Sequence, residues 1–149
     1  MSKFFTIKPD NFHCDVEVST VFMECNHNIL FLQRASHKAL APSTWAVPGG
    51  KLEKEETPLE GLKREIQEEL ALYPEEGDLT YKTSFFVEHP AMRYRLHLFH
   101  WQLKELPKIT LCPEEHQAFL WQPIEHVCLL PLLEGQLEAF HAIYSKAHS

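Results

Sequence analysis

The sequence lacks a long apolar run, a closely spaced cysteine pair, an excess of positive charge and any internal repeat. No stretch approaches the roughly 18 consecutive apolar residues that read as a membrane-spanning helix. The first residues, MSKFFTIKPDNFH, are too polar for the apolar region of a secretory signal peptide. The sequence therefore predicts a cytoplasmic protein that has no membrane partner.

Cysteine usage and net charge exclude further classes of protein. The four cysteines form no C-x-x-C pair and no metal-finger spacing, so we expect free thiols. The net charge is −7 with histidine neutral, which argues against a surface for a nucleic-acid polymer. An acidic protein that binds anions needs a local source of positive charge, such as a bound metal ion.

The length and composition of the chain predict one globular domain. The chain of 149 residues is 44% hydrophobic and 23% charged, which predicts a single domain over residues 1–149 with one core. Alternating and apolar segments predict strands, and helical spacing predicts helices after Thr57 and over residues 132–146. The predicted strands cover residues 15–25, 29–34, 79–88, 92–103 and 118–121, and NHN between the first two predicts a tight turn. This order predicts an α/β fold in which a mixed sheet is covered on both faces.

The segment VPGGKLEKEETPLEGLKREIQEELAL (Val47–Leu72) carries the clearest helix signals. Thr57 is placed to cap the helix, Pro58 suits its first position, and Glu60 completes a Thr-x-x-Glu capping box. Apolar residues recur at helical spacing and predict one stripe that faces the core. The members of this stripe are Leu59, Leu62, Ile66 and Leu70.

Three glutamates of this helix, Glu65, Glu68 and Glu69, lie at positions i, i+3 and i+4. Like charges at such spacing destabilise an isolated helix by about 0.2–0.5 kcal/mol per pair. A solvated acidic face is the ordinary interpretation, but such a face usually interleaves charges of both signs. The helix also follows two adjacent glycines, which allow a backbone carbonyl to approach a ligand closely. Carboxylates and a carbonyl form an all-oxygen site that suits Mg²⁺ or Mn²⁺.

The same residues resemble the signature of a known family. Gly50, five residues, Glu56, seven residues and then REIQEE from Arg64 to Glu69 resemble the Nudix box of the Nudix (MutT-type) hydrolases. That box reads G-x5-E-x7-R-E-U-x-E-E-x-G-U, where U is a bulky apolar residue, and its last position falls on Leu72.

The chain departs from the box at one position, where Ala71 replaces the expected glycine. In the family this glycine ends the helix in a left-handed conformation, which costs another residue roughly 1–2 kcal/mol. Either Ala71 adopts that conformation, or the helix continues towards Pro74. The departure concerns the end of the helix and leaves the carboxylates unchanged.

The resemblance implies an α/β/α sandwich around a mixed sheet, with a catalytic helix and a C-terminal helix. Nudix enzymes cleave a nucleoside diphosphate linked to another group, and water attacks a phosphorus while Mg²⁺ or Mn²⁺ holds substrate and water. The implied partner is a small-molecule nucleotide or another diphosphate. The sequence leaves open whether the protein is a monomer or a homodimer.

The resemblance also assigns roles to single residues. By position, the metal ligands are Glu65, Glu68, Glu69 and the backbone carbonyl of Gly49 or Gly50. Glu56 and Arg64 match residues that orient this cluster. From helical spacing we also expect Arg64 to pair with Glu60 and Glu68, four residues away on either side.

Three residues outside the cluster are further candidates. Glu115, in PEEHQAFLW, is an alternative general base to a glutamate of the box, and otherwise a solvated loop charge. Lys51 resembles the phosphate-contacting lysine of members with GGK, and otherwise is a surface lysine. Arg34, at the end of a predicted strand, is placed to reach a phosphate or to remain a surface charge.

The substrate is predicted by elimination. The chain has no SQP after the box and no LLTxR before it, which mark two other subfamilies. The leading interpretation is a nucleoside triphosphate pyrophosphohydrolase that releases a monophosphate and pyrophosphate, with 8-oxo-dGTP among the candidates. Other substrates left open are ADP-ribose, a nucleotide sugar, dihydroneopterin triphosphate and a dinucleoside polyphosphate. A non-catalytic nucleotide-binding module is the alternative from another class, although such modules typically lose box glutamates.

Overall fold

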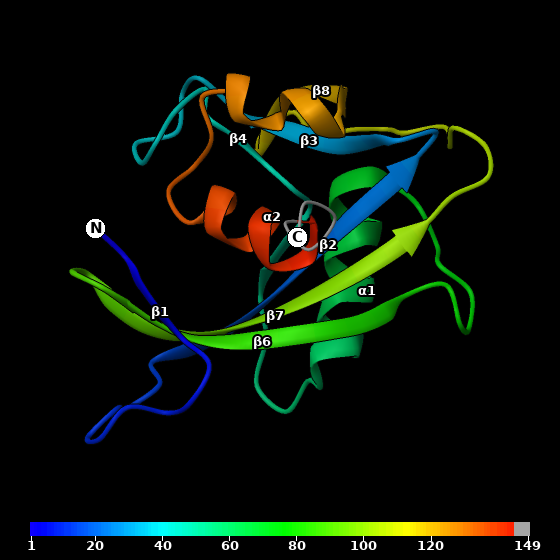
Figure 1. Cartoon of the computed structure of the whole chain (residues 1–149). Coiled ribbons are helices and arrows are strands. Elements are labelled where there is room, and N and C mark those ends of the chain that lie inside the picture. The colour runs from blue at the N-terminus through cyan, green and yellow to red at the C-terminus, as the bar shows by residue number, and fades with distance from the viewer. Residues whose placement is uncertain (145–149) are drawn as a thin grey trace.

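The computed structural model of the protein describes residues 1–144, which form a sheet with helices on both sides (Figure 1). The strands are β1 (Lys3–Phe5), β2 (Val16–Cys25), β3 (Asn28–Arg34), β4 (Trp45–Ala46), β5 (Gly49–Lys51), β6 (Thr80–His89), β7 (Met92–Gln102) and β8 (His116–Pro123). The helices are α1 (Pro58–Leu70), the 3-10 helix η1 (Ile124–Leu129) and α2 (Gln136–Tyr144). No helix within residues 1–144 is long and apolar enough to cross a membrane.

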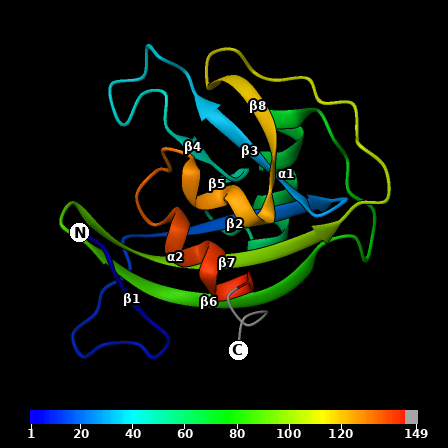
Figure 2. The same ribbon diagram turned by 45° about the horizontal axis from the view of Figure 1, so that its top comes forward.

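All eight strands belong to one mixed sheet with the order β1-β6-β7-β2-β3-β4. Strand β5 pairs in addition with β2, and β8 pairs with β3. The central pair β2 and β7 is parallel, whereas the other pairs are antiparallel. With α1 on one face and α2 on the other (Figures 1 and 2), this arrangement confirms the predicted α/β/α sandwich.

The central strand β2 is buried on both faces, and its alternating side chains enter two separate clusters. Val21 and Met23 pack with the α1 residues Leu62, Ile66 and Leu70. Phe22 lies in the other cluster, with Phe140 of α2. Helix α1 is therefore held against the sheet along the stripe that its sequence predicted, with one exception at its start.

The exception is Leu59, which was predicted to lie in the core but is 39% exposed. The capping box itself is confirmed, because the amide of Glu60 donates to Thr57 Oγ1 at 3.1 Å and the amide of Thr57 donates to Glu60 Oε1 at 2.9 Å. Leu59 stands in the first turn that this cap creates, outside the residues that cover the rest of the stripe. Helical spacing predicted correctly that Leu59 lies on the apolar stripe. It could not show how far along the stripe the sheet packs against α1.

The short turn between β2 and β3 follows the sequence closely. Cys25 pairs with Asn28 across the sheet, so Asn26 and His27 alone make the turn. Both have left-handed backbones, with φ of 51° and 63°, the combination that a tight type I′ hairpin turn requires. The prediction of a tight turn in NHN is therefore confirmed.

Helix α2 begins later than the predicted start at residue 132. Leu133 donates to the carbonyl of Trp45 at 2.9 Å, so the segment before the helix runs beside β4. Gly135 then adopts a φ of 92°, which lies outside helical geometry. Pairing with β4 therefore delays the helix, and the predicted end near residue 146 lies outside the described residues.

Ala71 ends α1 in the left-handed conformation, with φ 56° and ψ 38°, so the first of the two alternatives holds. Its amide donates to the carbonyl of Gln67 at 3.0 Å. The helix thus stops where the family pattern has glycine, although this chain carries a side chain there.

Replacing Ala71 with glycine is expected to raise the free energy of unfolding by about 0.5–1 kcal/mol. The gain is the relief of a left-handed alanine, roughly 1–2 kcal/mol, minus about 0.5–1 kcal/mol for the greater freedom of glycine in the unfolded chain. Urea unfolding of wild type and Ala71→Gly measures the change. The control is Ala142→Gly inside α2, which should destabilise, and destabilisation by both variants would contradict the prediction.

Candidate functional site

The candidate site forms where α1 meets the glycine strand that precedes it. Strand β5 pairs with β2 through Thr20↔Gly49 and Ser19↔Gly50. The Ser19 hydroxyl donates to the carbonyl of Pro58 at 2.9 Å. Strand β2 therefore anchors both the glycines and the start of the helix, which fixes their relative position.

Both glycines lie in close contacts, and the closest ones of Gly49 are with the backbone of β2. A Cβ atom at Gly49 would clash with the carbonyl oxygen of Ser19 in β2, and a Cβ at Gly50 would lie 2.5 Å from the carboxyl carbon of Glu65. The absence of side chains thus allows a helix carboxylate to approach the backbone of β5. Gly61 has a different role from these two, because its missing side chain makes room for Leu52.

Glu69 is the most deeply placed carboxylate of the site, with 8% of its surface exposed. The amide of Gly49 donates to Glu69 Oε1 at 3.1 Å. Burial, followed by repulsion from Glu65, raises the pKa of Glu69 well above its usual range. A buried carboxylate with a negative neighbour is stabilised by a positive charge beside it.

Glu65 repeats this pattern one helical turn earlier. Its side chain is 15% exposed, and burial raises its pKa even though Arg64 opposes the shift. Glu68 lies at the rim of the cluster, with 58% of its side chain exposed. The three predicted metal ligands therefore range from buried to exposed along one edge of α1.

Arg64 holds this cluster to the segment before the helix. It binds Glu56 through two contacts, Nε to Oε2 at 2.8 Å and Nη2 to Oε1 at 3.0 Å. It also donates to Glu65 at 3.1 Å, to Glu68 at 3.3 Å and to the carbonyl of Lys51 at 3.0 Å. The hydrogen bond from Arg64 lowers the pKa of Glu56, so this carboxylate stays ionised as an anchor.

The expected pairing of Arg64 with Glu60 is wrong. The Glu60 side chain accepts the Thr57 amide in the capping box instead. Arg64 binds Glu56, which is eight residues away and lies in the loop before α1. Helical spacing can identify partners on the same helix, but a partner in a loop depends on how the loop folds back.

Arg64→Lys is expected to lower kcat about a hundredfold. Lysine keeps the charge but lacks the planar fork that binds Glu56 at two points, and a small misplacement of catalytic groups costs a factor of this order. Steady-state kinetics and a thermal melt measure the effect on rate and on folding. Lys63→Arg, on the same helix, is the control, and activity of Arg64→Lys within threefold of wild type would contradict the prediction.

The donor set suits a hard divalent cation. Glu65, Glu68 and Glu69 offer only oxygen, as Mg²⁺ and Mn²⁺ prefer. Burial raises the pKa of Glu69, so a cation beside this carboxylate would favour its ionised form. Within residues 1–144 no three acidic, histidine or cysteine side chains converge on one point as they stand. Glu65 and Glu68 instead contact Arg64. Ligation by a carbonyl of Gly49 or Gly50 stays a prediction.

The three candidates outside the cluster, Glu115, Arg34 and Lys51, have different surroundings. The negative charge of Glu115 adds to the rise in the pKa of both Glu65 and Glu69, of which burial is the main cause. Arg34 donates through Nε to the carbonyl of Leu40 at 3.0 Å, and its charge helps to lower the pKa of Glu115. The Lys51 side chain is exposed, and its role in phosphate binding stays a prediction.

The sequence did not predict two contacts of the site. The first is the Gly49 amide, which serves Glu69 as a donor where only a carbonyl was expected. The second is Lys38, whose Nζ lies 2.7 Å from Glu115 Oε2 and whose hydrogen bond lowers the pKa of Glu115. No periodicity marks a lysine in a polar loop, so no signal in the sequence could have identified it.

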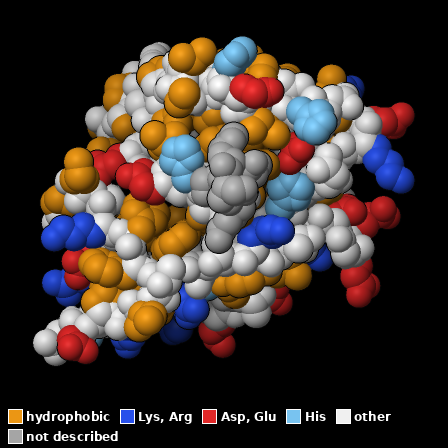
Figure 3. All heavy atoms as spheres, in the orientation of Figure 1, with side chains coloured by type: hydrophobic (Ala, Val, Ile, Leu, Met, Phe, Trp, Pro, Cys, Tyr) orange, Lys and Arg blue, Asp and Glu red, His pale blue; other side chains and the backbone are white. Residues whose placement is uncertain are grey.

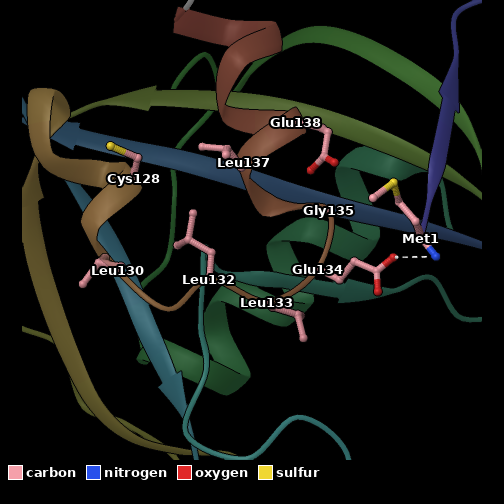
Figure 4. A pocket seen from close by; sticks show the side chains of 9 residues that line it. All are labelled: Met1, Cys128, Leu130, Leu132, Leu133, Glu134, Gly135, Leu137 and Glu138. Carbon is pink, nitrogen blue, oxygen red and sulfur yellow. Dashed lines mark ion pairs between the residues drawn. The ribbon is translucent and has the colours of Figure 1, made fainter.

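A separate hollow of about 400 Å³ lies on the α2 side of the molecule (Figure 4). Its walls come from η1, the segment after it and α2, and they include Cys128, Leu132 and Leu137. Figure 3 shows this side of the molecule, where apolar side chains lie among charged ones. Helix α1 covers the opposite face of the sheet (Figure 1), so this hollow is distinct from the carboxylate cluster.

Comparison with known proteins agrees with this geometry. A family model described as NUDIX domain matches residues 15–143. The chain is 32% identical over 133 residues to the CTP pyrophosphohydrolase of Escherichia coli (strain K12), covering 86% of this chain and 93% of that protein. It is 44% identical over 46 residues to the 8-oxo-dGTP diphosphatase of Proteus vulgaris, covering 31% of this chain and 41% of that protein. The solution structure of the E. coli ORF135 protein superposes with a TM-score of 0.68 at 25% identity, covering 89% of this chain and 91% of that one.

Proposed function

The chain belongs to the Nudix family of hydrolases, and we propose that it is a metal-dependent nucleoside triphosphate pyrophosphohydrolase. Its products would be a nucleoside monophosphate and pyrophosphate. The observation that carries the proposal is the buried Glu69 and the half-buried Glu65, which lie against the two glycines of β5. Two carboxylates in contact with a glycine strand are suited to a cation and its anionic ligand.

The residues of the site would have two roles, metal binding and positioning of the metal ligands. Glu65, Glu68 and Glu69 would hold the divalent ion, and Arg64 would keep their helix in register with the loop through Glu56. The bound ion would supply neutralisation of phosphate charge and a more acidic water.

Hydrolysis requires one proton transfer besides the exchange of bonds at phosphorus. The oxygen of water bonds to phosphorus, the bond from that phosphorus to the α–β bridging oxygen breaks, and a carboxylate accepts the proton of the water. Nucleoside monophosphate and pyrophosphate are the two fragments. A glutamate of α1 and Glu115 are the two candidates for this base. The hydrogen bond from Lys38 lowers the pKa of Glu115, so this carboxylate is ionised in the free protein. Release from Lys38 would remove that effect and make Glu115 a stronger base.

The proposal of a nucleoside triphosphate as substrate rests on named relatives. The CTP pyrophosphohydrolase is matched over nearly its whole length, and the 8-oxo-dGTP diphosphatase is matched over a shorter segment. Both names describe cleavage of nucleoside triphosphates. A cytidine or an oxidised guanine nucleotide is therefore the first substrate to examine.

A substrate panel tests this proposal. It comprises CTP, dCTP, the other nucleoside triphosphates, 8-oxo-dGTP, ADP-ribose, diadenosine polyphosphates, nucleotide sugars and dihydroneopterin triphosphate, each with Mg²⁺ or Mn²⁺. We expect release of pyrophosphate from a nucleoside triphosphate. Preference for another diphosphate would correct the substrate alone. Nucleotide binding without turnover of any member would show a non-catalytic binding module and overturn the proposed activity.

A further inference from the structure

The loop between β3 and β4, residues 35–44, is tied to the segment that begins β8. The amide of Ala35 donates to the carbonyl of Glu115 at 3.0 Å, and the amide of Ser36 donates to Gln117 Oε1 at 2.8 Å. His37 Nε2 lies 3.1 Å from the carbonyl of Glu114. Figure 2 shows the end of β3 beside the start of β8, where this loop departs. Each of the four residues 35–38 therefore contacts the segment 114–117.

The rest of the loop is held in a conformation that its sequence does not favour. Ala41 and Ser43 have φ of 48° and 63°, in a region that residues with side chains avoid. Contacts with Arg34 impose this shape, since its carbonyl accepts the amide of Ser43 at 3.1 Å and its Nε donates to Leu40. Strained backbone of this kind persists where surrounding contacts determine it. Lys38 lies in the preceding turn, which its amide closes by donating to the carbonyl of Ala35 at 3.1 Å.

Lys38 is the cation of this region whose partner can be exchanged. Its Nζ contacts Glu115 Oε2 at 2.7 Å, and both side chains are partly exposed, at 27% and 51%. Exposed ion pairs contribute little to stability, so a ligand of higher charge can displace the carboxylate. Arg64, by comparison, is committed to Glu56 through two hydrogen bonds and to a backbone carbonyl.

The position of this ion pair connects it to the metal-binding carboxylates. Strand β8, which begins directly after Glu115, pairs with β3, and Leu30 and Leu32 of β3 pack against α1. The negative charge of Glu115 also contributes to the raised pKa of Glu65 and Glu69. An ammonium group within hydrogen-bonding distance of Glu115 therefore lies at the edge of the same cluster. A diphosphate bound through a metal ion at that cluster would bring its free oxygens into this edge.

We propose that Lys38 is a substrate-binding residue, whose ammonium group holds Glu115 in the free protein and transfers to a phosphate oxygen when a diphosphate binds. The exchange releases the Glu115 carboxylate beside the reacting groups. Lysine suits this task because it is a compact charge on a flexible stem. The inference rests on the proposed function, since it requires a diphosphate at the α1 cluster.

The test compares Lys38→Met, Lys38→Arg and the control Lys104→Met, an exposed lysine in the segment after β7. The probe is methylenediphosphonate with Mg²⁺, because it carries no base and cannot be hydrolysed. Calorimetry should show that Lys38→Met weakens its binding at least about tenfold, the scale of one charge-assisted contact. Lys38→Arg should stay within about threefold of wild type, and Lys104→Met should be unchanged. Equal binding by wild type and Lys38→Met, including no binding by either, overturns the inference.

A double variant separates contact with phosphate from an action through Glu115. If Lys38 only neutralised Glu115, then Lys38→Met combined with Glu115→Gln would recover the binding of the probe. We expect no recovery, and full recovery would overturn the inference. Weaker probe binding by Lys38→Met in a protein that hydrolyses nothing in the substrate panel would remove the proposed function but support the inference. Turnover by the wild type, together with unchanged probe binding in Lys38→Met, would support the proposed function and overturn the inference about Lys38.

Discussion

Glu68→Gln is expected to lower kcat at least about a thousandfold while the protein stays folded. Glu68 is 58% exposed, so glutamine leaves no buried group without a partner, and surface changes of this kind shift stability by less than about 0.5 kcal/mol. The same change removes one negative ligand from the proposed metal site. Loss of about 4 kcal/mol of transition-state stabilisation, within the several that a metal ion supplies, corresponds to a thousandfold in rate.

The measurement is kcat at saturating substrate and metal, together with the melting temperature. The matched control is Glu76→Gln, because Glu76 is an exposed glutamate in the segment after α1. We expect Glu76→Gln to retain full activity and both variants to melt with the wild type. Retention of a tenth or more of wild-type kcat by Glu68→Gln would show that Glu68 is not a metal ligand in the reaction.

Removal of divalent cations is expected to abolish turnover and to destabilise the protein. The buried Glu69 has a negative neighbour and a single backbone donor, so a bound cation should favour the folded state. At ten times its dissociation constant, an ion that binds only the folded state adds about 1.4 kcal/mol, or roughly 3–5 °C for a chain of this size. Melts after treatment with a chelator, with and without added Mg²⁺ or Mn²⁺, measure the shift.

The direction of the pH dependence follows from the raised pKa of Glu69. Its folded-state pKa lies above the unfolded value, so its contribution to the stability of the metal-free protein is complete below the unfolded pKa. That contribution is lost as pH rises through the folded pKa. Added Mg²⁺ should therefore stabilise more at about pH 8 than at about pH 5.5, because protons compete for the same carboxylate. Glu69→Gln should reduce this difference without abolishing it, because the pKa of Glu65 is raised as well. An equal metal shift at both pH values in the wild type would contradict the assignment.

Local signals predicted the parts of the fold that depend on neighbours in the sequence. The capping box of Thr57 and Glu60 and the tight turn at Asn26 and His27 were both confirmed. These features are set by short-range hydrogen bonds and backbone preferences, which a few adjacent residues determine. The late start of α2 was missed, because Leu133 bonds to Trp45, a residue far away in the sequence.

The sequence by itself determined which residues could form the site. The spacing of the glutamates on α1 places them along one edge of the helix, and the glycines before the helix permit a close approach. Their order also identified the family, because six positions of the Nudix box are met in one short segment. Such information is local, since helical geometry converts spacing directly into direction.

Only the tertiary structure decided how these residues differ from one another. Glu69 is buried and Glu68 is exposed, although both carry the same side chain on the same helix. Arg64 selects Glu56 rather than Glu60, and Lys38 reaches Glu115 across 77 positions of the chain. The physical reason is that burial and charge pairing depend on the packing of strands and loops from distant segments, which no local spacing records.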